Sequence, residues 1–511
     1  MINTIDSFLN KTTMYRLTLY YLIMLVGVAT FAGLFGLMPY QPLDIILSTL
    51  LAVLICDISN LVFSKFFHAT TNTESYLITA LILVLIIPTK FPSNVSFLIL
   101  ASGFAMISKY LLTVEKKHIF NPAAAAVAGV ALLSPEHIAT WWVGTPVMLP
   151  FVFAGGLLLV RKIERESLVS VFISVYLILV ALFAIFHTGS ITSLITTFKD
   201  SLLHTALFFF TFVMLTEPIT SPATKKHQSR YSALTALLYA TPQLHLLGIV
   251  VTPEVALCIS NIYSYIVNPK YRLSLMLRNK LRLSPDTFAY IFDTPDKIKY
   301  IPGQYMEWTL PHDNSDNRGD RRYFSLASSP TEQNLIIAVK FYVPSSSYKR
   351  ALYNLMPNQK IIAAQLSGDF VMPDNPQVPL VFIAGGVGVA PFRSMIRYIV
   401  DKKIKCNIVL FFINRTIQDI YFADTLAESE KYGVRTVYSL TDTAAIPQNW
   451  KGKVGRPTPE MIKVEVPDWG NRTYYISGPQ LMVQSIENML KGMGINKGNI
   501  KTDFFPGYAE S

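Results

Sequence analysis

Leu380-Val-Phe-Ile-Ala-Gly-Gly-Val-Gly-Val-Ala-Pro391 is the stretch that decides how the second half of this chain folds. The apolar residues predict a buried strand, the glycines predict a tight turn, and the proline suits the first turn of a helix. Backbone without side chains lets a dinucleotide diphosphate approach the amino end of that helix. The expected contacts from this stretch are Gly385, Gly386, Gly388 and Pro391.

Further strands flank this turn. Asn407–Ile413 reads as the next strand and is followed by Asn414-Arg-Thr416, and Tyr475-Ile-Ser-Gly-Pro479 reads as a later one. Upstream, residues 271–373 alternate and turn like a small antiparallel barrel. Within it, Pro302-Gly-Gln-Tyr305 precedes a strand and Arg322-Tyr-Phe-Ser325 lies in another. A guanidinium pairs well with a diphosphate, so an Arg-x-aromatic-Ser strand is consistent with a flavin nucleotide site.

Together and in this order, these motifs resemble the ferredoxin–NADP reductase superfamily over about residues 272–511. The resemblance implies FAD on the barrel and NAD(P)H on the α/β domain. Its FAD contacts would be Tyr305, Arg322, Tyr323, Phe324 and Ser325, with Lys340, Ser347 and Lys349 near the diphosphate. Its NAD(P)H contacts would be Gly385, Gly386, Gly388, Pro391, Ser477, Gly478 and Pro479. The usual glycine before the diphosphate-binding serine is missing from Val343–Lys349.

The same resemblance implies catalytic roles for Ser325, beside the flavin N5 edge, and for Asp503 and Phe505. The last two belong to the segment Asp503–Tyr508, which would approach the flavin where nicotinamide docks. Arg415 would meet a 2′-phosphate, which favours NADPH over NADH, although arginine also caps strands.

The first half of the chain is different in composition. The whole chain has 511 residues, 51 % of them hydrophobic, and a formal net charge of +11. Apolar runs separated by short polar loops continue to a seam near Asn268–Pro269, which predicts an integral membrane protein. We read ten apolar segments: 16–37, 42–63, 75–88, 95–112, 122–133, 146–160, 168–186, 202–215, 233–251 and 253–267.

Lysine and arginine gather in alternate loops, for example at Lys116 and Lys117, at Arg161 and Lys162, and at Lys225 and Lys226. The positive-inside rule then puts both termini and the second half in the cytoplasm of a multi-pass protein of the cell membrane. Loop bias also explains the positive charge, so we expect no nucleic-acid partner. The domain boundaries that follow are 1–270 for the membrane domain, 271–375 for the FAD barrel and 376–511 for the NAD(P)H domain.

The redox and metal chemistry of the side chains is sparse. Cys56, Cys258 and Cys406 are far apart, which excludes an iron–sulfur cluster ligated by this chain and a disulfide framework. Histidines do not pair within apolar segments as stacked haems require, and we expect no metal site. Asp57 lies within an apolar segment, where it is either an ion, proton or ligand contact or has no function.

A weak repeat links the two halves of the membrane domain. Pro88–Pro92 ends the third segment as Pro218–Pro222 ends the eighth, and Pro122 opens the fifth as Pro253 opens the tenth. Because five is an odd number, a second copy of five segments crosses the membrane in the opposite orientation. This predicts an inverted 5+5 repeat with a binding site at the interface of the two copies.

The stretches His118-Ile-Phe-Asn-Pro-Ala-Ala-Ala-Ala126, Thr216-Glu-Pro-Ile-Thr-Ser-Pro222 and Thr79–Pro88 resemble the flavin-carrying membrane subunits of sodium-pumping NADH:quinone reductase and of the Rnf complex, the NqrB/RnfD family. The resemblance implies a ten-helix protein that binds a flavin, with Asn121, Thr145 and Glu217 as candidate contacts. Asn121 and Glu217 are equally explained as helix caps. The Gly-Ala-Thr that carries covalent FMN in that family is absent around Thr145, so we expect non-covalent FMN or riboflavin.

The sequence therefore predicts transfer of electrons from cytoplasmic NAD(P)H through FAD to a membrane-bound flavin. An extracytoplasmic acceptor would follow: a flavoprotein, a free flavin, a metal or a quinone. Two alternatives remain open. One is an NAD(P)H:quinone reductase, with or without ion coupling, whose electrons do not cross the bilayer. The other is a flavin or ion transporter with a regulatory reductase domain.

Overall fold

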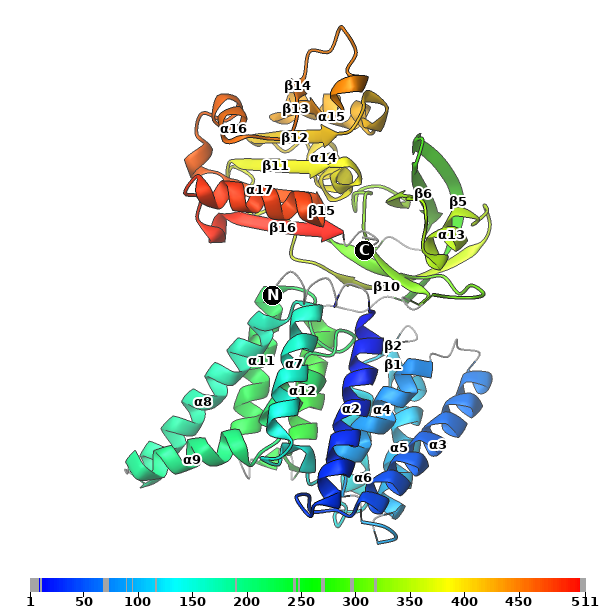
Figure 1. The fold of residues 1–511 in the computed structure, drawn as a ribbon, viewed down its shortest axis with the longest axis vertical. Helices are drawn as coiled ribbons and strands as arrows, with labels where there is room; N and C mark the ends of the chain where they lie inside the picture. The colour runs from blue at the N-terminus through cyan, green and yellow to red at the C-terminus, as the bar shows by residue number, and fades with distance from the viewer. Residues whose placement is uncertain are drawn as a thin grey trace. The chain divides into compact units, whose positions relative to one another are not determined.

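The computed structural model describes residue 9 and residues 12–67, 73–88, 90–93, 95–114, 117–188, 191–241, 245–246, 249–267, 272–294, 298–316 and 319–505. The seam at Asn268–Pro269, Lys116 and Tyr508 lie outside the described residues. The chain divides into two compact units, Met1–Tyr271 and Arg272–Ser511. The first is mainly helical, and the second contains an antiparallel sheet followed by a parallel sheet with helices, as Figure 1 shows.

The helices of the first unit follow most of the predicted apolar segments. They are α2 (Met14–Leu34), α3 (Pro42–Phe66), α4 (Thr73–Ile86), α5 (Val95–Leu111), α6 (Pro122–Leu133), α7 (Leu149–Ile163), α8 (Glu166–Thr188), α9 (Ile191–Leu203), α10 (Leu207–Phe209), α11 (Lys225–Ala240) and α12 (Pro253–Val267).

Three features differ from the prediction. The segment 202–215 is a short α10 that continues as the π-helix Phe210–Met214. The segment 233–251 is shifted, because α11 begins at Lys225 and ends at Ala240. Polar residues in its first turns, such as the buried Gln228, extend the helix beyond the apolar run that marked it. The amphipathic α9 was missed because a search for apolar runs does not detect it.

Among the described residues, three helices are long and apolar enough to cross a membrane: Met14–Leu34, Pro42–Phe66 and Glu166–Phe186, with mean hydropathies of 2.0, 2.2 and 2.9. The remaining apolar helices are shorter, as Thr73–Ile86 illustrates. A bilayer core of about 30 Å needs roughly 20 helical residues. The ten-span arrangement therefore stays a prediction.

Helix packing in the first unit has a recurring order. In its first part α2 packs on α4, α3 on α5, and α5 on α6. In its second part α7 packs on α10 and the π-helix, α8 on α11, and α11 on α12. The two parts also meet through α2 with α7 and α6 with α12. With α9 set aside, these contacts of the first part recur in the second, and the inverted 5+5 repeat stays a prediction.

The second unit begins with an antiparallel six-stranded sheet of order β8-β7-β10-β5-β6-β9. Its strands are β5 (Arg272–Ser284), β6 (Thr287–Asp293), β7 (Tyr305–Thr309), β8 (Arg321–Ser325), β9 (Leu335–Lys340) and β10 (Lys360–Ser367), with the short α13 (Ser347–Tyr353) before β10. Trp308, Tyr290 and Phe292 are fully buried in its core. The antiparallel fold expected for this part is confirmed.

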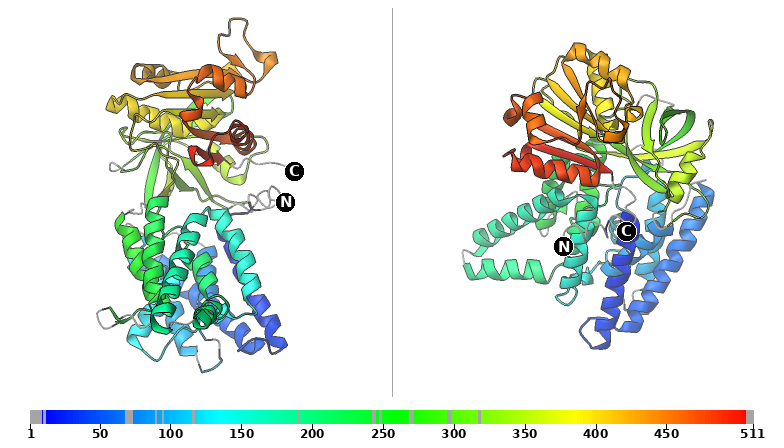
Figure 2. Two further views of the ribbon diagram at one scale, coloured as in Figure 1. Left: turned by 90° about the vertical axis from the view of Figure 1, so that its left-hand side faces the viewer. Right: turned by 45° about the horizontal axis from the view of Figure 1, so that its top comes forward.

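A parallel six-stranded sheet of order β14-β13-β12-β11-β15-β16 follows. Its strands are β11 (Leu380–Gly385), β12 (Ile408–Asn414), β13 (Val434–Leu440), β14 (Lys453–Val454), β15 (Thr473–Pro479) and β16 (Ile500–Phe505). The helices α14 (Ala390–Lys402) and α15 (Ala423–Ser429) cover one face, and α16 (Pro459–Glu465) and α17 (Gln480–Gly492) cover the other (Figure 2). Strand order reverses between β11 and β15, so the carboxyl ends of these two strands form the crevice where such sheets bind ligands.

Candidate functional site

The glycine-rich turn after β11 is built by close backbone packing. Gly386 has φ of 52°, a conformation that L side chains adopt rarely. A Cβ on Gly388 would lie 2.3 Å from the carbonyl oxygen of Ser477. Pro391 lies in the first turn of α14. The predicted residues of β11, α14 and the Ser477-Gly478-Pro479 end of β15 therefore meet at one place, the switch point of the sheet.

Two buried polar side chains at this edge have no hydrogen-bond partner among the described residues. The unpaired atoms are Oγ of Ser477, at the end of β15, and both the oxygen and the nitrogen of the Asn414 side-chain amide, at the end of β12. Both residues are 3 % exposed or less. An unpaired buried polar group costs free energy, so a ligand with polar atoms fits here. Asn414 was missed as a site residue, because the sequence alone does not show that its amide is buried.

Arg415 extends from the same strand end into solvent. Its side chain is 78 % exposed, and its Nε lies 3.3 Å from Oδ2 of Asp442 after β13. A guanidinium at this position suits a 2′-phosphate, whereas a carboxylate suits ribose hydroxyls. The two side chains favour opposite coenzymes, so the preference for NADPH stays a prediction.

Strand β8 presents the predicted FAD contacts on two faces. Arg322 and Phe324 share one face with Tyr348 of α13: the guanidinium carbon lies 5.0 Å from the Tyr348 ring centroid, and the Phe324 ring lies 6.2 Å from it. Tyr323 and Ser325 lie on the other face, where the Tyr305 and Tyr323 rings meet edge to face at 5.6 Å. A planar ring and a diphosphate fit these aromatic and guanidinium groups.

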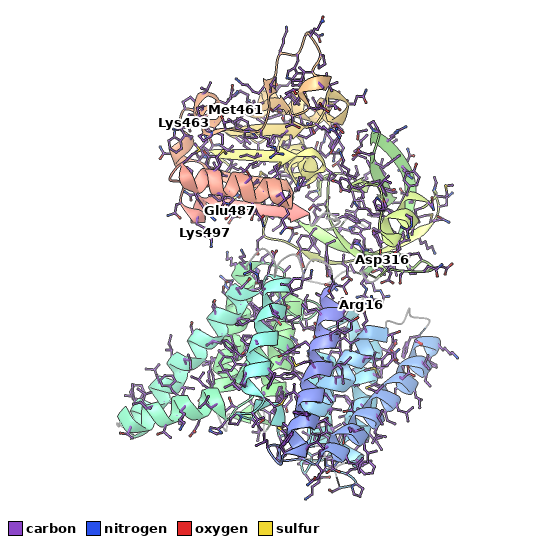
Figure 3. The ribbon with its side chains drawn as sticks, viewed as in Figure 1. Arg16, Asp316, Met461, Lys463, Glu487 and Lys497 are labelled. Carbon is purple, nitrogen blue, oxygen red and sulfur yellow. The ribbon has the colours of Figure 1, made fainter. Side chains whose placement is uncertain are left out.

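The predicted diphosphate contacts are only partly brought together. Ser347 lies near Arg322 through Asp316 (labelled in Figure 3), whose carboxylate accepts a 2.9 Å bond from the Ser347 backbone N–H and lies 3.6 Å from the guanidinium. The lysines have other partners. Lys340 Nζ lies 3.1 Å from Asp286, and Lys349 Nζ donates to the Lys340 carbonyl at 2.6 Å.

Burial works against the ionised form of Asp286, but hydrogen bonds from Lys340, Ser284 and Thr287 outweigh it and hold the pKa of that carboxyl below its usual value. Lys340 is therefore one side of a formed ion pair, which a phosphate would have to compete for.

The two expected catalytic residues whose side chains are described come together. Ser325 Oγ donates to Asp503 Oδ2 at 3.3 Å, which links the end of β8 to β16. The backbone of Phe505 pairs with that of Pro479 at the carboxyl ends of the parallel strands. The Phe505 side chain is not among those described. This hydrogen bond between Ser325 and Asp503 joins the barrel to the α/β domain at two of the predicted catalytic residues.

A buried ion pair holds that meeting in place. Arg393 of α14 donates to both carboxylate oxygens of Glu332 and, at 3.0 Å, to the carbonyl of Ala327. The Ser329 backbone N–H donates to the same carboxylate at 2.7 Å. These contacts join the loop after β8 to the helix that follows the glycine turn.

The first unit contains an open cavity, and the empty space of about 710 Å³ measured there includes solvent outside its mouth. Its wall is mainly apolar and includes Ile78 and Ile82 of α4, Leu159 of α7 and Val213 of the π-helix. Its polar lining includes Lys109, His118, Asn121, Thr216 and Glu217. Arg16, labelled in Figure 3, pairs with Glu74 at 2.9 Å and so joins the amino ends of α2 and α4.

Asn121 and Glu217 are brought together in this cavity. Asn121 Nδ2 donates to Glu217 Oε2 at 2.9 Å, and its Oδ1 accepts from the Ala124 N–H as the cap of α6. Thr220 Oγ1 donates to the same Glu217 oxygen at 3.0 Å. His118 Nε2 lies 3.7 Å from the other oxygen. Asn121 is thus both a helix cap and a lining residue.

Thr145 is not part of the cavity lining. It follows Trp142, whose Nε1 donates to the carbonyls of Val84 and Ile87 at the carboxyl end of α4, whereas the cavity is lined by the earlier part of that helix, from Ser75 to Ile82. The candidate contacts of the first unit therefore divide, with Asn121 and Glu217 at one place and Thr145 at another.

Comparison with known proteins supports the class that this geometry defines. Residues 382–488 match the model of the protein family described as oxidoreductase NAD-binding domain. The chain is 28 % identical over 242 residues to flavohemoprotein A of Dictyostelium discoideum, and 26 % identical over 225 residues to a glycine betaine monooxygenase reductase subunit of Chromohalobacter salexigens. It is also 26 % identical over 248 residues to one component of the Na(+)-translocating NADH-quinone reductase of Neisseria gonorrhoeae.

These alignments cover 44, 43 and 45 % of the chain and 58, 60 and 59 % of the respective relatives. The chain thus carries an oxidoreductase module of the ferredoxin–NADP reductase type, with its antiparallel and parallel sheets in the second unit. The NqrB/RnfD resemblance of the first unit has no counterpart in these matches and stays an inference from sequence.

Proposed function

We propose that this chain is a membrane flavoprotein that takes electrons from cytoplasmic NAD(P)H through FAD and delivers them across the membrane. A second flavin, FMN or riboflavin, would lie non-covalently in the cavity of the first unit and pass electrons to an extracytoplasmic acceptor. The cavity carries the proposal: a mainly apolar pocket with the hydrogen-bonded pair Asn121 and Glu217 in its lining lies within an apolar helical unit, in a chain that also carries a reductase module.

In the second unit, the turn at Gly386 and Gly388 would admit the NAD(P)H diphosphate, and Ser477 and Asn414 offer unpaired polar atoms to the nucleotide. FAD, when bound, supplies a ring that accepts a hydride and releases single electrons. Arg322 would neutralise its diphosphate, Phe324 would pack on it, and Ser325 with Asp503 would orient a proton-bearing edge of the ring.

In the first unit, Asn121 and Glu217 would orient the polar edge of the second ring, and Lys109 would offset negative charge on it. Lys109 Nζ donates to the backbone carbonyl of Ser75 at 3.0 Å and lines the cavity. A cation beside a ring that gains electrons would stabilise its reduced form. The amide and carboxylate are held to each other before any ligand binds, so the site is preorganised.

Acid extraction of the purified full chain tests the cofactor set. FAD together with released FMN or riboflavin supports two flavins, whereas FAD alone contradicts them. Flavin that stays on the peptide would contradict the non-covalent attachment.

Vesicle reconstitution tests the direction. NAD(P)H supplied on the reductase face should reduce an acceptor trapped inside. Asn121→Ala should abolish that transfer and leave FAD reduction intact, and Arg322→Ala should abolish both. Trapped acceptor that stays oxidised while an acceptor on the NAD(P)H face is reduced would refute transmembrane transfer.

A quinone reductase is the second candidate. The largely apolar wall of the cavity also accommodates a quinone ring, and one relative is by name a component of a Na(+)-translocating NADH-quinone reductase. Reduction of a membrane-soluble quinone analogue that depends on Asn121, with one flavin per chain, would favour this function over the first.

A further inference from the structure

Glu254 is a buried carboxyl away from the cavity. It is the second residue of α12 and is 3 % exposed. Its Oε1 accepts a hydrogen bond from Trp141 Nε1 at 3.1 Å. Its Oε2 is buried and has no hydrogen-bond partner among the described residues. Acidic residues are common in the first turn of a helix, but there they ordinarily face water.

The partner of Glu254 is held in an uncommon backbone conformation. Trp141 has φ of 50° and ψ of 40°, which few aromatic residues adopt. Its backbone N–H and that of Thr140 both donate to the carbonyl of Ile86, at 2.9 and 3.0 Å. Its ring lies 5.8 Å from that of Phe210 in the π-helix. Strained conformations persist where the surroundings impose them, often at functional sites.

This place is distinct from the cavity. The cavity is lined by the part of α4 from Ser75 to Ile82, whereas Trp141 is bonded to Ile86, the last residue of that helix. The last lining residue of α4 is Ile82, and at 1.5 Å per residue Ile86 lies roughly 6 Å further along the helix axis. Glu254 therefore belongs to the other end of α4.

The chemistry of the site points to a proton as its ligand. Hard cations take about six or more oxygen ligands, and one carboxyl does not supply them. The described residues contain no group of three or more His, Cys, Asp and Glu side chains able to hold a metal. Among the described residues, the groups that interact with Glu254 are Thr252 and Cys258 on its own segment, Tyr239 of α11 and Trp141. None of them is basic, so none supplies a counter-charge.

We propose that Glu254 is a proton-binding site of the membrane unit, whose Oε2 atom gains and loses a proton while Oε1 stays bonded to Trp141. Uptake forms one O–H bond with a proton from water and changes no oxidation state. On the proposed function, electrons entering the unit add negative charge, and a proton at Oε2 compensates for it. That second role rests on the proposed function, whereas proton binding itself does not.

A pH titration of tryptophan fluorescence tests the site in the full chain, in lipid nanodiscs and without any electron donor. Buried glutamates titrate as high as about pH 8–9, so the titration covers about pH 4 to pH 9. We expect a transition that Trp141→Phe removes, because a protonated and an ionised carboxyl beside an indole quench it differently. Glu254→Gln should abolish the transition, and Glu136→Gln, an acid whose side chain is 68 % exposed, should leave it in place.

The same samples give a second readout. Infrared difference spectra between the two ends of the titration should show a protonated-carboxyl band that Glu254→Gln removes and Trp141→Phe shifts in pH. A transition that survives Glu254→Gln, or no Trp141-dependent transition and no such band, would overturn the proposal. Failure of vesicle electron transfer with this titration intact would contradict the proposed function alone.

Discussion

The ion pair between Arg393 and Glu332 gives the sharpest test of how the second unit is held together. The two side chains are 11 % and 22 % exposed. Glu332→Ala leaves the guanidinium buried without its counter-charge and removes the acceptor of the Ser329 N–H. Breaking a buried pair from one side costs about 3–5 kcal/mol, and the partial exposure of Glu332 puts this one near 3 kcal/mol.

A loss of about 3 kcal/mol lowers the Tm of a unit of this size by roughly 6–12 °C. The assay is thermal unfolding of the full chain in detergent, followed by the fluorescence of released FAD. Glu428→Ala is the matched control. Glu428 of α15 pairs with Arg397, which lies on α14 like Arg393, but the Glu428 side chain is 45 % exposed. We expect less than about 1 kcal/mol there, or a shift below about 4 °C.

The double variant Glu332→Ala/Arg393→Met decides the cause. Replacing both members of a buried pair with apolar groups is often close to neutral, so the double variant should regain more than half of the lost Tm. A single variant within about 2 °C of the parent, or a double variant less stable than Glu332→Ala, would refute the assignment of the effect to an uncompensated buried charge.

Three further outcomes follow from the site geometry. Gly388→Ala should lower the free energy of unfolding by about 1–3 kcal/mol and weaken NAD(P)H binding, because its Cβ meets backbone atoms of Ser477. Gly492→Ala, with open space around its Cβ, should do neither, and calorimetric titration of both variants with NAD(P)H measures the binding. If NADPH is the coenzyme, Arg415→Ala should raise its Kd about 10–100-fold and leave that of NADH unchanged, and equal effects on the two would contradict a 2′-phosphate contact. Hydrogen bonds from Lys453 and Arg435 lower the pKa of Glu465 in the folded chain. Its stabilising effect is therefore present above the unfolded pKa of about 4.3 and is lost as the pH falls through the folded pKa. Glu465→Gln should flatten the fall in Tm below about pH 4, and an unchanged slope would contradict this.

The elements that the sequence predicted correctly are those that short stretches of neighbouring residues determine. The run Leu380–Pro391 has one physical interpretation, since an apolar strand, a turn that requires φ of 52° at Gly386 and a proline in the first helical turn leave little alternative. The two sheets follow from alternation and from buried apolar runs in the same way. Asn121 and Glu217 were identified as separate polar residues in apolar surroundings, and the structure joins them at 2.9 Å.

Long-range packing explains what the sequence did not predict. Lys340 and Lys349 have the right charge for a diphosphate, but the ion pair of Lys340 with Asp286 depends on a strand pairing that no local pattern specifies. Asn414 and Glu254 are ordinary residues in sequence, a polar strand end and an acid after a helix-opening proline. Each becomes notable only because the fold buries polar atoms without partners.

The two units pose one chemical problem. A nicotinamide gives up its two electrons together, as hydride, whereas transfer through an apolar helical unit proceeds between discrete redox groups. The three cysteines of the chain are too few for an iron–sulfur cluster of its own. On the proposed function, a ring held by Asn121 and Glu217 would be the carrier, and negative charge gained there would need a nearby positive charge. Lys109 would provide that charge in the cavity, and a proton on Glu254 would provide it at the other end of α4, so the proposed electron movement through this unit would have charge compensation at both places.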